Sequence, residues 1–74
     1  MSLEVGTMIG IVVDTFMLSI RKEPKAVSEI AVIVSEKAEV EVDMSFVDSD
    51  WYKVETSTGD VGYAPKKFIA IKKG

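Results

Sequence analysis

The residue types in this sequence leave few kinds of chemistry open. The 74 residues include no His and no Cys. This excludes a Cys nucleophile, a Cys/His zinc site and any triad that uses imidazole as its base. Only carboxylates, Lys, Ser and Tyr remain as reactive groups, and so short a chain has little room for the deep pocket of an enzyme. We therefore expect a domain without catalytic activity.

Two short motifs have a catalytic or metal-binding counterpart. Ser19 and Lys22 have the Ser-x-x-Lys spacing of penicillin-recognising enzymes, but that chemistry requires a helix and the surrounding residues favour a strand. Asp48 and Asp50 offer two oxygens to Ca²⁺, but no third acid follows at the required spacing. A turn closed by an Asx-type hydrogen bond is the better interpretation, and we expect no metal or other cofactor.

Charge limits the partners. The net charge of -3 argues against a nucleic-acid binder. Residues 28–60 hold nine acids and two bases, whereas residues 61–74 hold four Lys and no acid. The acidic centre can attract a cationic ligand, although a solvated face is the simpler interpretation. No run of 18 apolar residues occurs, so we expect no membrane insertion.

Short apolar runs rich in Val and Ile predict an all-β domain. We expect strands at 8–13, 16–20, 29–34, 39–43, 51–55, 61–64 and 68–71, with a 3₁₀ turn at 65–67. Five to seven strands of this size favour a small closed barrel, because closure removes exposed edges. The predicted core is Ile11, Val13, Leu18, Ile20, Ile30, Val32, Val40, Val42, Tyr52, Val54, Val61 and Ile69.

Trp51 is the first candidate for a binding residue. Strand alternation places Trp51 and Lys53 on the face opposite Tyr52 and Val54. A large aromatic side chain on the outer face of a small domain often marks a binding surface. The alternative, that Trp51 covers loop residues as a lid over the core, stays open.

Residues 50–70, DWYKVETSTGDVGYAPKKFIA, resemble the C-terminal half of a Src homology 3 (SH3) domain. The shared pattern is a Trp-aromatic pair, a Gly-containing hairpin, Gly-Tyr-x-Pro and a closing aromatic-aliphatic strand. The N-terminal half instead resembles bacterial SH3 domains, whose Leu-x-Val-Arg-x-x-Pro and Val-x-Val patterns correspond to Leu18, Ile20, Arg21, Pro24, Val40 and Val42. Departures are Ser19 in place of the usual Asn, the turn SEKA without Gly or Asn, and Phe68 where many relatives have Tyr.

The resemblance covers residues 9–71 and implies an SH3-like β-barrel. Residues 1–8 are then interpreted as a cloning start or flexible lead-in, and residues 72–74 as a C-terminal tail. The opening MSLEVG lacks the features of a signal peptide, so any targeting signal is expected elsewhere in a longer protein.

The resemblance also implies a function. Bacterial SH3 domains are non-catalytic modules of exported cell-wall hydrolases, phage lysins and surface proteins. The expected partner is cell-wall peptidoglycan, through its peptide cross-bridges, and the expected location is the cell wall or surface. The alternative is an interaction module for a Pro-rich or intramolecular peptide segment. In isolation the domain is expected to be a monomer.

In SH3 domains of the eukaryotic kind, the corresponding positions line a groove for extended peptides. The resemblance therefore implies a groove at Trp51, Pro65 and Phe68, with Tyr63 inside the barrel. Asp48 and Asp50 would form an acidic rim that favours an amine-bearing ligand.

Overall fold

The computed structural model describes residues 6–72, which form seven strands and one 3₁₀ turn. The elements are β1 (Thr7–Val12), β2 (Met17–Arg21), β3 (Ile30–Ser35), β4 (Glu39–Asp43), β5 (Trp51–Thr56), β6 (Val61–Pro65), η1 (Lys66–Phe68) and β7 (Ile69–Ile71). Each predicted strand is present with bounds shifted by at most one residue. None of the described residues forms a helix long and apolar enough to cross a membrane.

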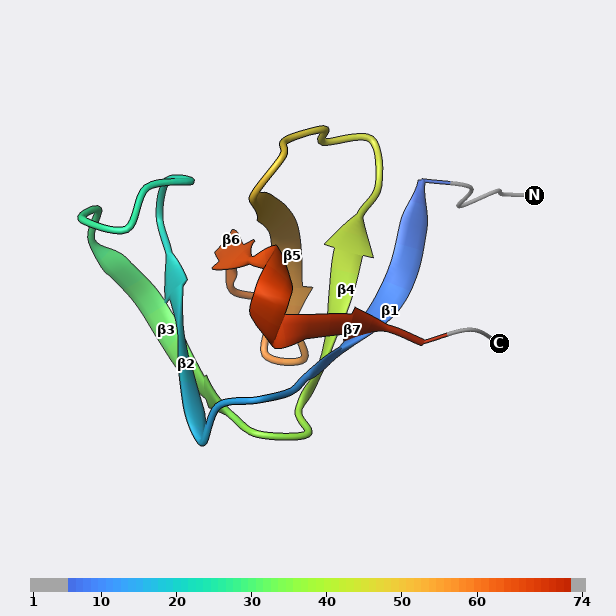
Figure 1. The fold of residues 1–74 in the computed structure, drawn as a ribbon, viewed down its shortest axis with the longest axis horizontal. Coiled ribbons are helices and arrows are strands. Elements are labelled where there is room, and N and C mark those ends of the chain that lie inside the picture. The colour runs from blue at the N-terminus through green and yellow to red at the C-terminus, as the bar shows by residue number, and fades with distance from the viewer. Residues whose placement is uncertain (1–5, 73–74) are drawn as a thin grey trace.

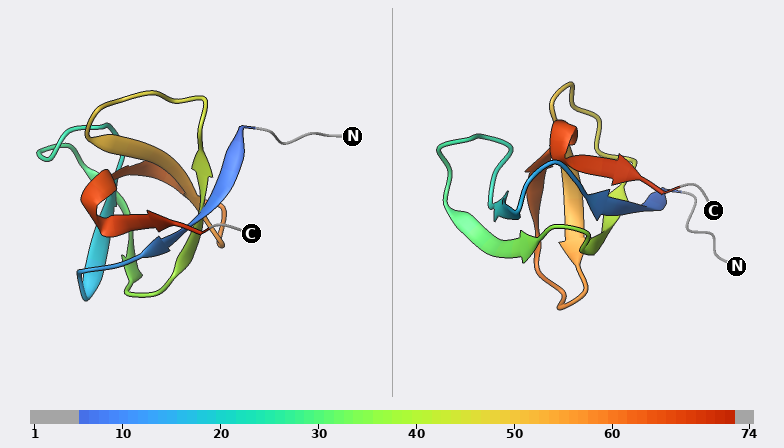
Figure 2. Two further views of the ribbon diagram at one scale, coloured as in Figure 1. Left: turned by 45° about the vertical axis from the view of Figure 1, so that its right-hand side comes forward. Right: turned by 60° about the horizontal axis from the view of Figure 1, so that its bottom comes forward.

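All strand pairs in the single sheet are antiparallel, in the order β3-β2-β6-β5-β4-β1-β7. The sheet bends around one interior, with β2 and β3 on one side and β4, β1 and β7 on the other (Figure 1). Figure 2 shows the same bend from two further directions. The expected all-β, barrel-like fold is confirmed. Among the described residues the ladder stays open, because β3 and β7 each pair with one neighbour only.

The core lies inside this bend. Its buried apolar residues come from six strands and are Val12, Leu18, Ile20, Val40, Val42, Val54, Ala64 and Ile69. Val32 and Tyr52 pack against them while partly exposed. In β5, Val54 is 1% exposed and lies on the inner face, as alternation from Tyr52 predicts.

Besides Val32 and Tyr52, four further positions of the predicted core are exposed or only half-buried. In β1 the buried side chain is that of Val12, and Ile11 and Val13 are half-buried. Ile30 is 44% exposed, beside a register shift at Ile20/Arg21 that leaves Ala31 without a partner in β2. Val61 is 52% exposed.

Val61 is outside because β6 turns its small residues inward. Gly62 and Ala64 are buried, and a Cβ built on Gly62 would lie 2.6 Å from the carbonyl oxygen of Arg21. The same Cβ would lie 2.6 Å from the Cγ2 of Ile20. β2 and β6 therefore approach each other too closely for a larger inward side chain at this point.

Candidate functional site

A groove opens where β5 begins and β6 ends. Its volume is about 510 Å³. The lining residues come from these two strands, η1 and the loops at 22–29 and 44–50: Ala26, Ser49, Asp50, Trp51, Pro65, Lys66 and Lys67. We call this the Trp51 groove. Two of the residues expected to form a binding face, Trp51 and Pro65, are thus brought together.

The backbone fixes the relative position of Trp51 and Pro65. They lie directly opposite each other in the β5–β6 ladder. Just beyond this pair, the N–H of Lys66 donates to the carbonyl oxygen of Asp50 over 2.9 Å. The Trp51 side chain is half-buried and, by alternation, lies on the outer face away from Val54. An aromatic ring and a proline ring therefore form adjacent parts of one outer surface.

Asp48 holds the backbone at the start of β5, next to the groove. Its Oδ2 accepts hydrogen bonds from the backbone N–H of Asp50 (2.9 Å) and of Trp51 (3.0 Å). This is the Asx-type turn that the sequence indicates, and it is confirmed. Asp48 does not line the groove. Of the two acids expected at the rim, only Asp50 lines the groove.

Two lysines, Lys66 and Lys67, line the groove as well, and the sequence pattern did not predict them there. The Nζ of Lys66 lies 5.1 Å from the centroid of the Tyr52 ring, and the Nζ of Lys67 lies 5.2 Å from that of Phe68. Such cation–π contacts favour these positions of the ammonium groups. The groove thus carries both signs of charge. The sequence signal was the Lys-Lys pair directly after Pro65.

Phe68 does not line the Trp51 groove. It is half-buried and packs against the core, and its exposed part lies under Lys67. Its connection with the groove is therefore through the lysine that it positions.

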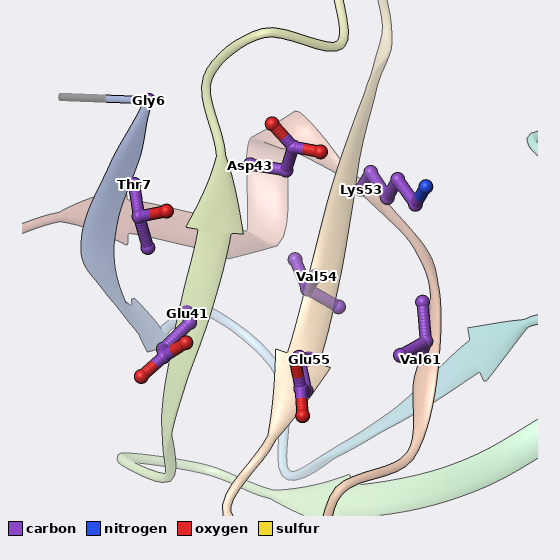
Figure 3. Close-up of a pocket in the computed structure, with 8 residues that line it drawn as sticks. All are labelled: Gly6, Thr7, Glu41, Asp43, Lys53, Val54, Glu55 and Val61. Atoms are coloured by element: carbon purple, nitrogen blue, oxygen red, sulfur yellow. The ribbon is translucent and has the colours of Figure 1, made fainter. Parts of the chain in front are cut away.

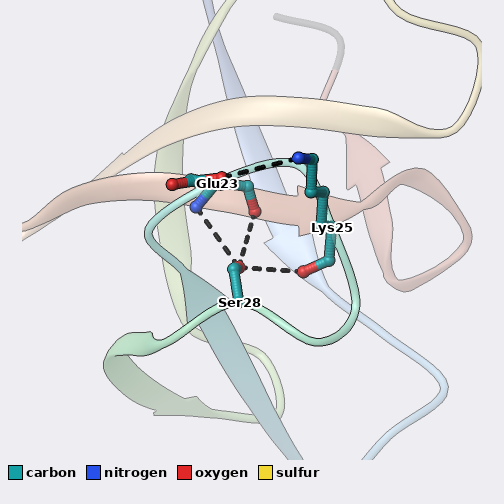
Figure 4. A network of polar contacts seen from close by, with 3 residues as sticks. All are labelled: Glu23, Lys25 and Ser28. Atoms are coloured by element: carbon teal, nitrogen blue, oxygen red, sulfur yellow. Dashed lines mark hydrogen bonds and ion pairs between the residues drawn. The ribbon is translucent and has the colours of Figure 1, made fainter.

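The loop at 22–29 contributes Ala26 to the groove, and the hydroxyl group of Ser28 makes several of the hydrogen bonds that hold it. The Ser28 Oγ lies 3.0 Å from the carbonyl oxygen of Glu23 and 2.8 Å from that of Lys25 (Figure 4). The Arg21 guanidinium donates to the carbonyl oxygen of Ser28 over 2.8 Å. These bonds link both ends of the loop to each other and to β2.

Tyr63 lies on the outer face and not inside the barrel, which corrects the expectation drawn from the family pattern. The inner positions of β6 are occupied by Gly62 and Ala64. The Tyr63 ring meets that of Phe46 edge to face, with centroids 5.2 Å apart. Tyr63 is two residues from Pro65 on the same face of β6, so aromatic surface continues beyond the groove.

A second hollow, of about 340 Å³, lies on the outer face of β4, β5 and β6 (Figure 3). Its side chains include Glu41, Asp43 and Glu55, with Lys53 at one side. Glu41 and Glu55 are directly opposite each other in the β4–β5 ladder. The acidic centre of the sequence therefore forms an electronegative surface, separate from the Trp51 groove.

One carboxyl group of this surface has a shifted pKa. The hydroxyl of Ser45 (2.6 Å) and its backbone N–H (2.9 Å) donate to Oδ1 of Asp43 and lower the pKa of that carboxyl below 3.8. Within residues 6–72, no three acidic groups lie close enough together to hold a metal ion.

No protein-family model, curated protein or solved structure matches this chain. The resemblance to bacterial SH3 domains therefore depends on the residues quoted above.

Proposed function

We propose that this domain is a non-catalytic binding module that holds a larger bacterial protein on cell-wall peptidoglycan through the peptide part of the polymer. The observation that carries the proposal is the Trp51 groove, in which an aromatic and a proline side chain lie side by side on the outer face. An extended peptide can lie along such a surface with little loss of conformational entropy.

The charges of the groove suggest how the peptide is oriented. Asp50 attracts an amine, as a cross-bridge or a stem lysine would supply. Lys66 and Lys67 attract a carboxylate, which every peptide stem with a free end carries. A ligand with both groups satisfies both sides of the groove. This extends the acidic rim expected from the sequence to a rim of mixed charge.

The test is co-sedimentation of the purified domain with isolated cell wall. Trp51→Ala should weaken binding by about 2 kcal/mol or more, as truncation of an aromatic anchor typically does. Phe16→Ala is the matched control, because Phe16 is 79% exposed and lies outside the groove. Circular dichroism and thermal unfolding establish that both variants are folded.

Separated wall components distinguish the possible ligands. Binding to peptide fragments and not to peptide-free glycan strands supports the proposal, and binding to the glycan alone contradicts its peptide part. Binding to a Pro-rich peptide array but not to cell wall would favour the alternative, a protein-interaction module. If Trp51→Ala is folded and binds cell wall as the unaltered domain does, the ligand site lies elsewhere.

A further inference from the structure

The loop at 22–29 reaches the Trp51 groove at a tight turn. Ala26, which lines the groove, follows Lys25 in a turn where the N–H of Ser28 donates to the carbonyl oxygen of Lys25 over 3.1 Å. Ala26 and Val27 are the two central residues of this turn. The position of this part of the groove wall therefore depends on the bonds between Lys25 and Ser28.

The burial of apolar side chains does not hold this loop. None of its residues is fully buried, Ala26 is exposed, and Val27 is 93% exposed. Two ion pairs within the loop, with N–O distances of 3.4 and 3.9 Å, join exposed side chains, and such pairs stabilise little. The shape of the loop therefore depends mainly on hydrogen bonds.

The Ser28 hydroxyl joins separate parts of the loop. Its Oγ lies 3.0 Å from the carbonyl oxygen of Glu23 and 2.8 Å from that of Lys25 (Figure 4). A hydroxyl has one hydrogen, so these two oxygens share it. The same Oγ accepts from the N–H of Glu23 over 3.4 Å. Loss of the hydroxyl would remove these bonds, while the bond of 2.8 Å from the Lys22 N–H to the Glu29 carbonyl oxygen would still close the base of the loop.

We propose that Ser28 is a positioning residue of the Trp51 groove: its hydroxyl holds the turn at Ala26 in place and thereby sets how tightly the groove binds its ligand. A wall that is already in place loses no conformational entropy on binding. A mobile wall lowers the apparent affinity in proportion to the fraction of molecules in which it is in place. The effect on affinity rests on the proposed function, whereas the positioning of the loop does not.

The first experiment needs no ligand, because the single Trp of the chain lines the same groove as Ala26. Acrylamide should quench the fluorescence of Trp51 more strongly in Ser28→Ala than in the unaltered domain, and the emission should shift to longer wavelength. Ser28→Thr keeps a hydroxyl and should restore both values. Ser57→Ala is the matched control, because Ser57 is exposed and lies outside the groove.

Thermal unfolding checks that all three variants are folded. Unchanged quenching in Ser28→Ala, or an equal increase in Ser57→Ala, would overturn the proposal. If Ser28→Thr is quenched as strongly as Ser28→Ala, the hydroxyl is not the group that positions the loop.

The second experiment is co-sedimentation with isolated cell wall. The bonds of one hydroxyl typically change an equilibrium about fivefold, so Ser28→Ala should bind about fivefold more weakly, while Ser28→Thr and Ser57→Ala should bind like the unaltered domain. If the unaltered domain binds and Ser28→Ala binds equally well, Ser28 does not set the affinity. If the unaltered domain itself does not bind, the proposed function fails, and the quenching experiment still decides whether Ser28 positions the loop.

Discussion

Gly62→Ala tests the close approach of β2 and β6. The added methyl group would lie 2.6 Å from the Arg21 carbonyl oxygen and 2.6 Å from the Ile20 Cγ2. The carbonyl belongs to the backbone of β2 and cannot rotate away as a side chain can. β2 and β6 must therefore separate at a point where they are joined by the pair of Arg21 and Tyr63.

The expected change in the free energy of unfolding of Gly62→Ala is the difference between two opposing effects. Forcing a methyl group into a packed site typically costs up to about 3 kcal/mol. Replacing a strand glycine returns about 0.5–1 kcal/mol by restricting the unfolded chain. The net loss is about 2 kcal/mol, a large fraction of the roughly 4–11 kcal/mol expected for a domain of 74 residues. At about 4–8 °C per kcal/mol, Tm should fall by about 8–16 °C.

Thermal and urea unfolding, followed by circular dichroism and by the fluorescence of the single Trp, measure this loss. Gly6→Ala is the spatial control, because a Cβ there meets nothing within 4 Å. Gly59→Ala distinguishes the effect of steric crowding from that of backbone strain. The surroundings of Gly59 are also open, but its φ is +90°, so the variant should lose about 1 kcal/mol of its free energy of unfolding. If the free energy of unfolding of Gly62→Ala is within about 0.5 kcal/mol of that of the unaltered domain, the close approach of β2 and β6 is wrong.

Further predictions concern the charged groups. Because hydrogen bonds from Ser45 lower the pKa of Asp43, this carboxyl should contribute stability above its unfolded pKa of 3.8 and lose that contribution as the pH falls through the lower folded value. An NMR titration of Ser45→Ala should show the pKa of Asp43 returning towards 3.8; an unchanged pKa would contradict the assigned cause. Glu55→Lys should raise the free energy of unfolding by about 0.5 kcal/mol, since it replaces a like-charge pair with an ion pair to Glu41. This gain should shrink in 1 M salt, and a gain independent of salt would argue against its electrostatic origin. Neither EDTA nor millimolar Ca²⁺ should change Tm, and a rise of several degrees with Ca²⁺ would reveal a site at the acidic turn at 48–50.

For β4 and β5, the sequence alone determined both the strands and their inner faces. In β4 the pattern Glu39-Val40-Glu41-Val42-Asp43 alternates strictly, and Val40 and Val42 are buried as predicted. In β5 the prediction for Val54 was confirmed in the same way. Alternation determines the face wherever polar and apolar residues take turns, because successive side chains point to opposite sides of a strand.

The Asx turn at Asp48 was likewise predictable, because it depends on residues adjacent in the chain. The position of Trp51 on the outer face follows from the same alternation as that of Val54. The pairing of Trp51 with Pro65 and the addition of Lys66 and Lys67 to the groove depend on how β5, β6 and η1 meet. These two features of the groove could be seen only in the folded structure.

Where every residue of a strand is apolar, tertiary packing decided which side faces inward. The run from Ile9 to Val13 contains no polar residue, so alternation of polar and apolar residues does not distinguish Val12 from its neighbours. The choice is made by Gly10, whose missing side chain leaves room for Ile69 and Val42 and places Val12 on the same inner face. In β6 the close approach of β2 admits only small residues, which turns Val61 outward. Such distances between strands remote in sequence are set by the completed sheet, and no pattern within a single strand contains them.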